Sequence, residues 1–253
     1  MDELRSVAVA AAEAGGDYLA TQFRTGEVAG EYGTDDVKAV ADREAESRIV
    51  DVIRESFPDH AIHGEESGQN GDHRYEWVID PLDGTNNFAS GLPSFATAVA
   101  VLDDGEPVVS TIYEPLVDDR YVAVTGEGAT RNGDPLSAAT DRDLRHGTIS
   151  LVVGLPAVRD ETLRARATQI ADALGEEAKR VVQTWSPCVD WGLVAGGRLE
   201  GIVCFHPDVY EQHAGSLLAA ESGVTSVARE ELYVGSPEPA IRDRLLDVLD
   251  ETA

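Results

Sequence analysis

The stretch "EWVIDPLDGTNNF", residues 76–88, begins as an apolar run and ends on two carboxylates, Asp80 and Asp83. The apolar half predicts a strand, and the glycine and threonine at 84 and 85 predict a turn that opens a helix. Carboxylates crowded at a strand end are costly unless a cation or a set of hydrogen bonds compensates their charge. This stretch is therefore the first candidate site.

The ligands that this stretch offers are all oxygens. Asp80, Asp83 and the backbone carbonyl of Leu82 suit Mg²⁺ or Mn²⁺ better than Zn²⁺. The first amides of a helix that opens at Gly84 favour a phosphate, because they have no intrahelical acceptor. Taken alone, Asp-Pro-x-Asp could equally be a structural turn.

A second acidic pair, Glu65 and Glu66 in "GEES", precedes the strand by about one loop. It could add a ligand from a neighbouring strand end, or it could be a plain surface loop. Two metal ions held by both pairs would stabilise the attacking water and the leaving oxygen of a phosphoryl transfer. The sequence thus indicates metal-assisted phosphate chemistry.

Acidic residues dominate the composition: 47 Asp and Glu face 20 Lys and Arg, for a formal net charge of -27. Such an excess repels itself at ordinary ionic strength, whereas about 1 M salt shortens the Debye length to about 3 Å. We therefore expect a cytoplasmic protein of a halophile. We expect no nucleic-acid partner, because phosphate backbones need clustered Lys and Arg. An acidic surface that recruits a basic partner is the alternative.

The two cysteines, Cys188 and Cys204, lack a CxxC spacing and a nearby pair of histidines. Sequence spacing therefore predicts neither a zinc site nor a redox motif, and both are expected to be small buried residues. Asp2 and Glu3 stand where a signal peptide carries basic residues, and no apolar stretch approaches about 20 residues. We expect an intracellular protein without a membrane partner.

Helical and strand periodicities alternate along the chain and predict a mixed α and β fold. Two subdomains are expected to pack as one body, residues 1–140 with the acidic motifs and residues 141–253. Helices are expected at about 3–23, 42–56, 161–174 and 213–222, with a closing helix around 241–248. Strands are expected at about 75–80, 94–115 with a turn at 103–105, 119–126, 147–154 and 201–205.

Four motifs, in order "GEES", "WVIDPLDGTNNFASGLP", "GEGATRNGDPL" and "HAGSLLAAESG", resemble the inositol monophosphatase family. This family lies within the wider fructose-bisphosphatase superfamily of metal-dependent, lithium-sensitive phosphatases. The resemblance covers about residues 35–225, and "DPLDGTNNF" is its most specific part. It implies an α+β or α/β fold built as a layered α-β-α-β-α sandwich, two or three Mg²⁺ or Mn²⁺ ions, and a homodimer.

The resemblance also implies metal-binding roles. Glu65 looks like the glutamate that binds metal and helps activate water, and Asp80 like the carboxylate that bridges two metals. The Leu82 carbonyl would complete the first metal site, and Asp83 would bind the second metal. Glu211 stands where the family usually has an aspartate ligand, and its extra methylene means that it must fold back or shift the metal.

Catalytic and phosphate-binding roles follow from the same resemblance. Thr85 would pair with Glu65 to orient the attacking water, beside Asp83. The backbone amides of Gly84 and Thr85 would hold the phosphate. Asp42 matches an acidic position near a mobile loop over the active site.

Departures from the family pattern gather at the substrate rim, for which Trp185, Cys204 and Glu211 are the predicted residues. Trp185 stands where the family has a small residue, and Cys204 where animal-type enzymes have a glutamate that contacts inositol. Because a thiol makes only weak hydrogen bonds, inositol recognition of that type is not supported. Lys38 and Ala39 replace residues of a loop linked to a third metal.

The predicted activity is hydrolysis of a small sugar or polyol phosphate, either inositol monophosphate or fructose 1,6-bisphosphate or both. A nucleotide 3'-phosphate presents the same dianionic monoester and is the first alternative. The second alternative is a non-catalytic regulatory relative that binds metal and phosphate without turnover.

Overall fold

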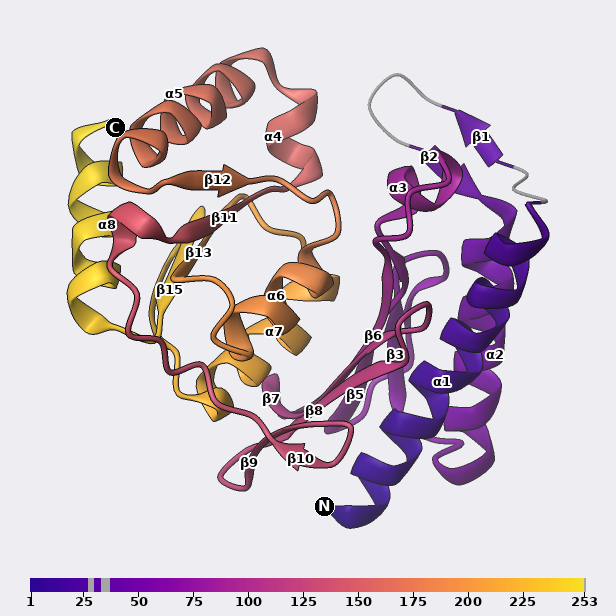
Figure 1. The fold of residues 1–253 in the computed structure, drawn as a ribbon. Helices are drawn as coiled ribbons and strands as arrows, with labels where there is room; N and C mark the ends of the chain where they lie inside the picture. Colours follow the sequence, from indigo (N-terminus) through magenta and orange to yellow (C-terminus); the bar gives the residue numbers. More distant parts are fainter. Residues whose placement is uncertain (27–29, 33–36, 253) are drawn as a thin grey trace.

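The chain folds into five alternating layers of helices and sheets (Figure 1). The computed structural model describes residues 1–26, 30–32 and 37–252. From one outer face to the other, the helical layers are α1 (Asp2–Thr25) with α2 (Val40–Ser56), then α6 (Pro187–Ala195) with α7 (Val209–Ser222), then α4 (Leu155–Arg159), α5 (Glu161–Glu177) and α8 (Pro239–Glu251). The predicted α-β-α-β-α sandwich is confirmed.

The first sheet separates the outer helices from the middle helical layer. Its strand order is β10-β9-β8-β7-β6-β5-β3-β4, and β3 and β5 are its one parallel pair among the described strands. The strands are β3 (Ala61–Gly64), β4 (Gly68–Asn70), β5 (Tyr75–Asp83), β6 (Ala96–Asp103), β7 (Glu106–Glu114), β8 (Asp119–Val124), β9 (Gly128–Arg131) and β10 (Asp134–Pro135). The short helix α3 (Thr85–Ala89) follows β5, and a separate ribbon pairs β1 (Gly30–Tyr32) with β2 (Val37–Ala39).

The second sheet has the order β12-β11-β13-β15-β14. The first three strands in this order, β12, β11 and β13, are parallel to one another. The next strand, β15, is antiparallel to both of its neighbours, β13 and β14. The strands are β11 (Thr148–Val153), β12 (Arg180–Val182), β13 (Gly201–Phe205), β14 (Thr225–Arg229) and β15 (Leu232–Ser236), and a 3-10 turn (Leu144–His146) precedes them. The boundary near residue 140 lies between the two sheets but stays a prediction, because α7 also packs on the first sheet, where Ser110 Oγ donates to the Ala214 carbonyl at 2.7 Å.

The predicted helix start at residue 213 is wrong, because α7 begins at Val209. Asp208 caps the helix: its side chain accepts from the amide three residues on, and Glu211 Oε1 accepts from the Asp208 amide at 3.3 Å. An Asp-x-x-Glu spacing of this kind satisfies two amides that a helix start leaves unpaired. The capping box therefore places Glu211 in the first turn of α7.

The middle helical layer is packed tightly at the crossing of α6 and α7. Trp191 of α6 is fully buried, and a Cβ added at Gly215 of α7 would lie 2.2 Å from its Nε1. Only glycine therefore allows this approach. Among the described residues, no helix combines the length and the apolar character needed to cross a membrane.

We expect Gly215→Ala to lower the free energy of unfolding by about 1–3 kcal/mol, because overpacking forces Trp191 or the backbone to move. The matched control is Gly175→Ala in α5, where an added Cβ would meet nothing within 4 Å. That change should be neutral or stabilise by up to about 1 kcal/mol through helix propensity. Urea unfolding of both variants measures the difference, and equal effects would contradict the packing argument.

Candidate active site

The end of β5 is bent so that it presents two carboxylates. The pairing of β5 with β6 shifts register between Asp80 and Asp83, which is the mark of a bulge. Thr97 Oγ1 donates to the Pro81 carbonyl inside this bend at 2.9 Å. Gly84 follows with a φ of 90°, and a Cβ there would lie 2.9 Å from the Ser94 carbonyl oxygen. Glycine is therefore required at position 84, where the chain turns into α3.

A cavity at the junction of the two sheets gathers residues from both halves of the chain. It encloses about 800 Å³, with open solvent at its mouth included. Of the residues predicted from the sequence, its lining contains Glu65, Asp80, Leu82, Asp83, Gly84, Thr85, Trp185 and Glu211. The fold therefore brings the two acidic motifs and the start of α7 to one place.

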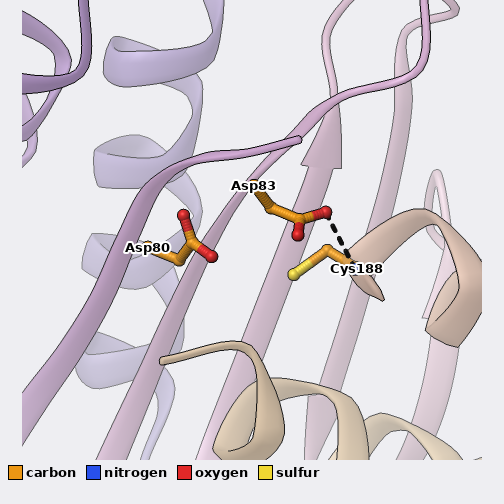
Figure 2. Close-up of side chains that lie close together, drawn as sticks. All are labelled: Asp80, Asp83 and Cys188. Atoms are coloured by element: carbon orange, nitrogen blue, oxygen red, sulfur yellow. Dashed lines mark hydrogen bonds between the residues drawn. The ribbon is translucent and has the colours of Figure 1, made fainter. Parts of the chain in front are cut away.

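Asp83 is anchored by the second half of the chain. Its Oδ2 accepts from Ser186 Oγ at 2.6 Å, just before α6. It also accepts from the Cys188 amide at 2.9 Å, in the first turn of α6 (Figure 2). Burial nevertheless raises the pKa of Asp83 to about 8, because the two hydrogen bonds offset only part of the lost hydration. In the protein without bound cations, this carboxyl therefore holds its proton near neutral pH.

Asp80 and Glu211 are also acidic side chains that are buried, away from the water that would stabilise their charge. Burial, reinforced by neighbouring carboxylates, holds the pKa of each well above its usual range. Glu211 Oε1 accepts from the Asp208 amide in the capping box, so its side chain turns toward the start of its own helix. Asp80 Oδ1 is buried and has no hydrogen-bond partner among the described residues. An orphaned carboxylate oxygen beside other carboxylates is the environment that a cation would stabilise.

These residues fit Mg²⁺ by the chemistry of their donors. Four carboxylates, on Glu65, Asp80, Asp83 and Glu211, line one cavity with the backbone of Leu82. Hard divalent cations prefer oxygen ligands of this kind. The Leu82 carbonyl also accepts from Thr85 Oγ1 at 3.0 Å, which leaves its second lone pair for another partner.

A buried glutamate of α2 holds the loop that carries Glu65. Glu46 is 4% exposed, and its two carboxylate oxygens accept from the amides of Glu66 and Ser67, each at 2.9 Å. The Glu65 amide donates to the Ile79 carbonyl of β5 at 3.2 Å. The loop is thus fixed from both sides, although the sequence pattern of α2 gave no reason to assign Glu46 a role.

Trp185 lies at the rim of the cavity and is 47% exposed. Its φ is 59°, in the left-handed region that a bulky residue rarely adopts. Glycine, which has no Cβ, adopts this backbone conformation without strain. Here the indole adds apolar surface to the rim at a cost of about 1–3 kcal/mol in backbone strain.

Cys204 does not reach the cavity, so its predicted substrate contact is corrected. The residue is the fourth of the five in β13, has no exposed surface and packs in the core between the two sheets. A side chain in that position has no path to a substrate. The side chains of Lys38 and Ala39 lie outside the described residues, as does most of the loop before them.

The cavity residues that were missed in the sequence include Asp190, Asp208 and Tyr210. Asp190 is an acid within the apolar helix α6, accepts from Thr184 Oγ1 at 2.9 Å, and has its pKa raised to about 7 by burial. The sequence contained a signal for two of them. Asp190 is an acid within an apolar helical segment, and Asp208 begins an Asp-x-x-Glu capping pattern. Nothing local marked Tyr210, which meets His63 of β3 edge to face.

Comparison with known proteins agrees with this geometry. A model of the inositol monophosphatase family matches residues 1–251. The chain belongs to the inositol monophosphatase family. The resemblance read from the four motifs is therefore confirmed.

Individual proteins match over most of their length. Nus factor SuhB of Escherichia coli (strain K12) is 36% identical over 227 residues, which are 88% of this chain and 84% of that protein. Among solved structures, the extragenic suppressor protein suhB of Bartonella henselae has a TM-score of 0.88 at 25% identity and covers 98% of both chains. The inositol monophosphatase of Anabaena has a TM-score of 0.84 at 27% identity, covering 99% of this chain and 96% of its own.

The raised pKa values predict a pH-dependent stability. Because the pKa of Asp83 rises from about 4 in the unfolded chain to about 8, the folded state holds its proton more tightly. The free energy of unfolding should therefore fall as pH rises between about 4 and 8. Urea unfolding with a chelator, in multimolar KCl to screen surface charges, measures this slope.

Asp83→Asn should flatten that slope, because asparagine does not titrate. The exposed Asp72 provides the matched control, and Asp72→Asn should keep the slope of the natural chain. A slope unchanged in Asp83→Asn would mean that buried acids other than Asp83 set the pH dependence.

Proposed function

We propose that the protein is a Mg²⁺-dependent phosphate monoester hydrolase that acts on a small sugar or polyol phosphate. One observation carries the proposal: Glu65, Asp80, Asp83 and Glu211, drawn from distant parts of the chain, line one cavity that includes a buried, unpartnered oxygen of Asp80. Membership of the inositol monophosphatase family supports the reaction class.

The residues of this chain would divide the work of hydrolysis. Glu65 would accept a proton from the attacking water, with Thr85 orienting that water. The first amides of α3, at Gly84 and Thr85, would hold the phosphate oxygens. When bound by the carboxylates, Mg²⁺ would neutralise charge on the phosphoryl group and lower the pKa of the attacking water. Ser186 would keep Asp83 oriented through its hydrogen bond.

The rim supports a small polyol or sugar, with inositol monophosphate and fructose 1,6-bisphosphate as the leading substrates. Acidic and apolar groups meet there: Asp208 offers carboxylate oxygens as acceptors for hydroxyl groups, and Trp185 and Leu155 offer apolar surface. A sugar ring presents hydroxyl donors and apolar faces in the same way. A nucleotide 3'-phosphate is the alternative that the exposed indole of Trp185 favours, since a base can stack on it.

A regulatory role without turnover is the second candidate function. The observation that favours it is the name of the E. coli relative, Nus factor SuhB, which is not the name of a phosphatase. The expectation that this chain has no nucleic-acid partner rests on its charge alone and stays a prediction, as do the homodimer and the cytoplasmic location. Filter binding of RNA in low and high KCl tests the first of these.

We expect Asp83→Asn to lower Mg²⁺-dependent phosphate release by more than about 100-fold, because the site loses a charged oxygen ligand. The assay offers inositol monophosphate, fructose 1,6-bisphosphate and a nucleotide 3'-phosphate in multimolar KCl. Asp72→Asn is the control and should match the natural chain. A normal rate in Asp83→Asn would refute the mechanism, and phosphate binding without turnover on all three substrates would favour the regulatory role.

We expect Glu46→Gln to weaken Mg²⁺ binding by roughly 10- to 100-fold, as loss of an outer support for a metal ligand does. Glutamine offers one acceptor oxygen where two amides need acceptors, so the Glu65 loop loses a hydrogen bond. The control is Glu44→Gln on the same helix, since Glu44 is half exposed and pairs with Arg48 on the surface. Calorimetric Mg²⁺ titration measures both variants, and equal affinities would contradict a positioning role for Glu46.

A further inference from the structure

The sulfur atom of Cys188 lies close to the carboxylates of Asp80 and Asp83. The spacing of the cysteines along the chain did not predict this. Cys188 Sγ and one carboxylate oxygen from each of Asp80 and Asp83 lie within 4.8 Å of one another, and all three residues are buried. Figure 2 shows the sulfur on the side of Cys188 that faces both carboxylates. Among the residues that the structure describes, this is the group of side chains with the spacing of metal ligands.

An independent observation also points to a ligand at this place. Asp80 is 5% exposed, and its Oδ1 has no hydrogen-bond partner among the described residues. Asp83 is held in place from the other side by Ser186 Oγ and by the amide of Cys188 itself. The cluster therefore combines three groups. The Asp83 carboxylate is held by two hydrogen bonds, the Asp80 carboxylate has a buried oxygen without a hydrogen-bond partner among the described residues, and Cys188 supplies a thiol.

We propose that Asp80, Asp83 and Cys188 form a mixed oxygen and sulfur site for a thiophilic divalent cation such as Zn²⁺ or Cd²⁺. Zinc takes thiolate sulfur at about 2.3 Å and carboxylate oxygen at about 2.0–2.2 Å in tetrahedral geometry, so its ligand atoms lie about 3.6 Å apart. Because the three atoms lie within 4.8 Å of one another, each pair needs to close by at most about 1 Å to reach that geometry, which rotation of the Cys188 and Asp80 side chains would supply.

Binding exchanges protons for the cation and involves no redox change. The S–H bond of Cys188 breaks, and the electron pair of the sulfur forms the bond to the cation. The thiol proton leaves to solvent, together with the proton that Asp83 holds near neutral pH. Mg²⁺ gains little from sulfur because it prefers oxygen ligands. A thiophilic cation would therefore bind more tightly here than at an all-oxygen site, and it would occupy Asp80 and Asp83 in competition with Mg²⁺.

The test is titration of the full chain with Cd²⁺ alone, followed by the ultraviolet charge-transfer absorption of a cadmium–thiolate bond. The natural chain and Cys204→Ala should both show this band, because Cys204 lies outside the cluster. Cys188→Ala should lose the band and bind Cd²⁺ roughly tenfold or more weakly. Mg²⁺ added to saturation should shift the Cd²⁺ titration of the natural chain to higher concentrations.

A band that survives in Cys188→Ala, or that never forms in the natural chain, would overturn the proposal. Circular dichroism shows whether Cys188→Ala is folded, and Cys188→Ser, which keeps the side-chain volume, is the second variant. The readout is independent of phosphate hydrolysis. Failure of the cadmium band would therefore leave the proposed activity standing, and absence of turnover would leave this site standing.

Discussion

Negative charge held away from water is the constraint on which the rest of this structure depends. Asp80, Asp83 and Glu211 are each buried, and each sits among other acids that raise the pKa of its carboxyl group. The protein offsets this cost only in part, with two hydrogen bonds to Asp83 and a capping box at Glu211. What is left uncompensated is the free energy that a bound cation would recover.

The layered fold is what brings these charges together. Asp80 and Asp83 end a strand of the first sheet, whereas the groups that orient Asp83 open α6 about a hundred residues later. Asn87 ties the two parts directly, because its amide donates to the carbonyls of Ser94 at 2.8 Å and Thr184 at 2.7 Å. A change in how α6 and α7 pack on the first sheet would therefore alter the position of Asp83 as well as the stability of the fold.

The sequence was most informative where structure and chemistry are local. "DPLDGTNNF" predicted a strand end, a turn and oxygen ligands because a few adjacent residues determine all three, and the Asp-Gly turn at 104–105 follows the same logic, with φ values of 51° and 88°. The five layers followed from family resemblance. Periodicity alone predicted helices and strands but did not say which helix covers which sheet.

The sequence was least informative where partners are distant along the chain. Glu46 and Cys188 acquire their roles from contacts with loops and strands that no local pattern connects to them. Cys204 shows the reverse: its alignment with a substrate-binding position suggested a contact that the depth of β13 in the core prevents. The start of α7 was a missed signal, since the Asp-x-x-Glu spacing was present in the sequence.

The acidic groups of this protein fall into two classes, those on the surface and those buried in the site, and a different cation should act on each class. The surface acids that give most of the net charge of -27 are hydrated, and bulk salt screens their repulsion over a few ångströms. The site carboxyl groups are buried and close together, so mobile ions screen their charge poorly, and only a bound proton or a cation in direct contact can neutralise it. KCl should therefore act on the stability of the whole chain, and Mg²⁺ on the site. Salt cannot substitute for a ligand in the cavity, because the field that a ligand must cancel lies inside the protein.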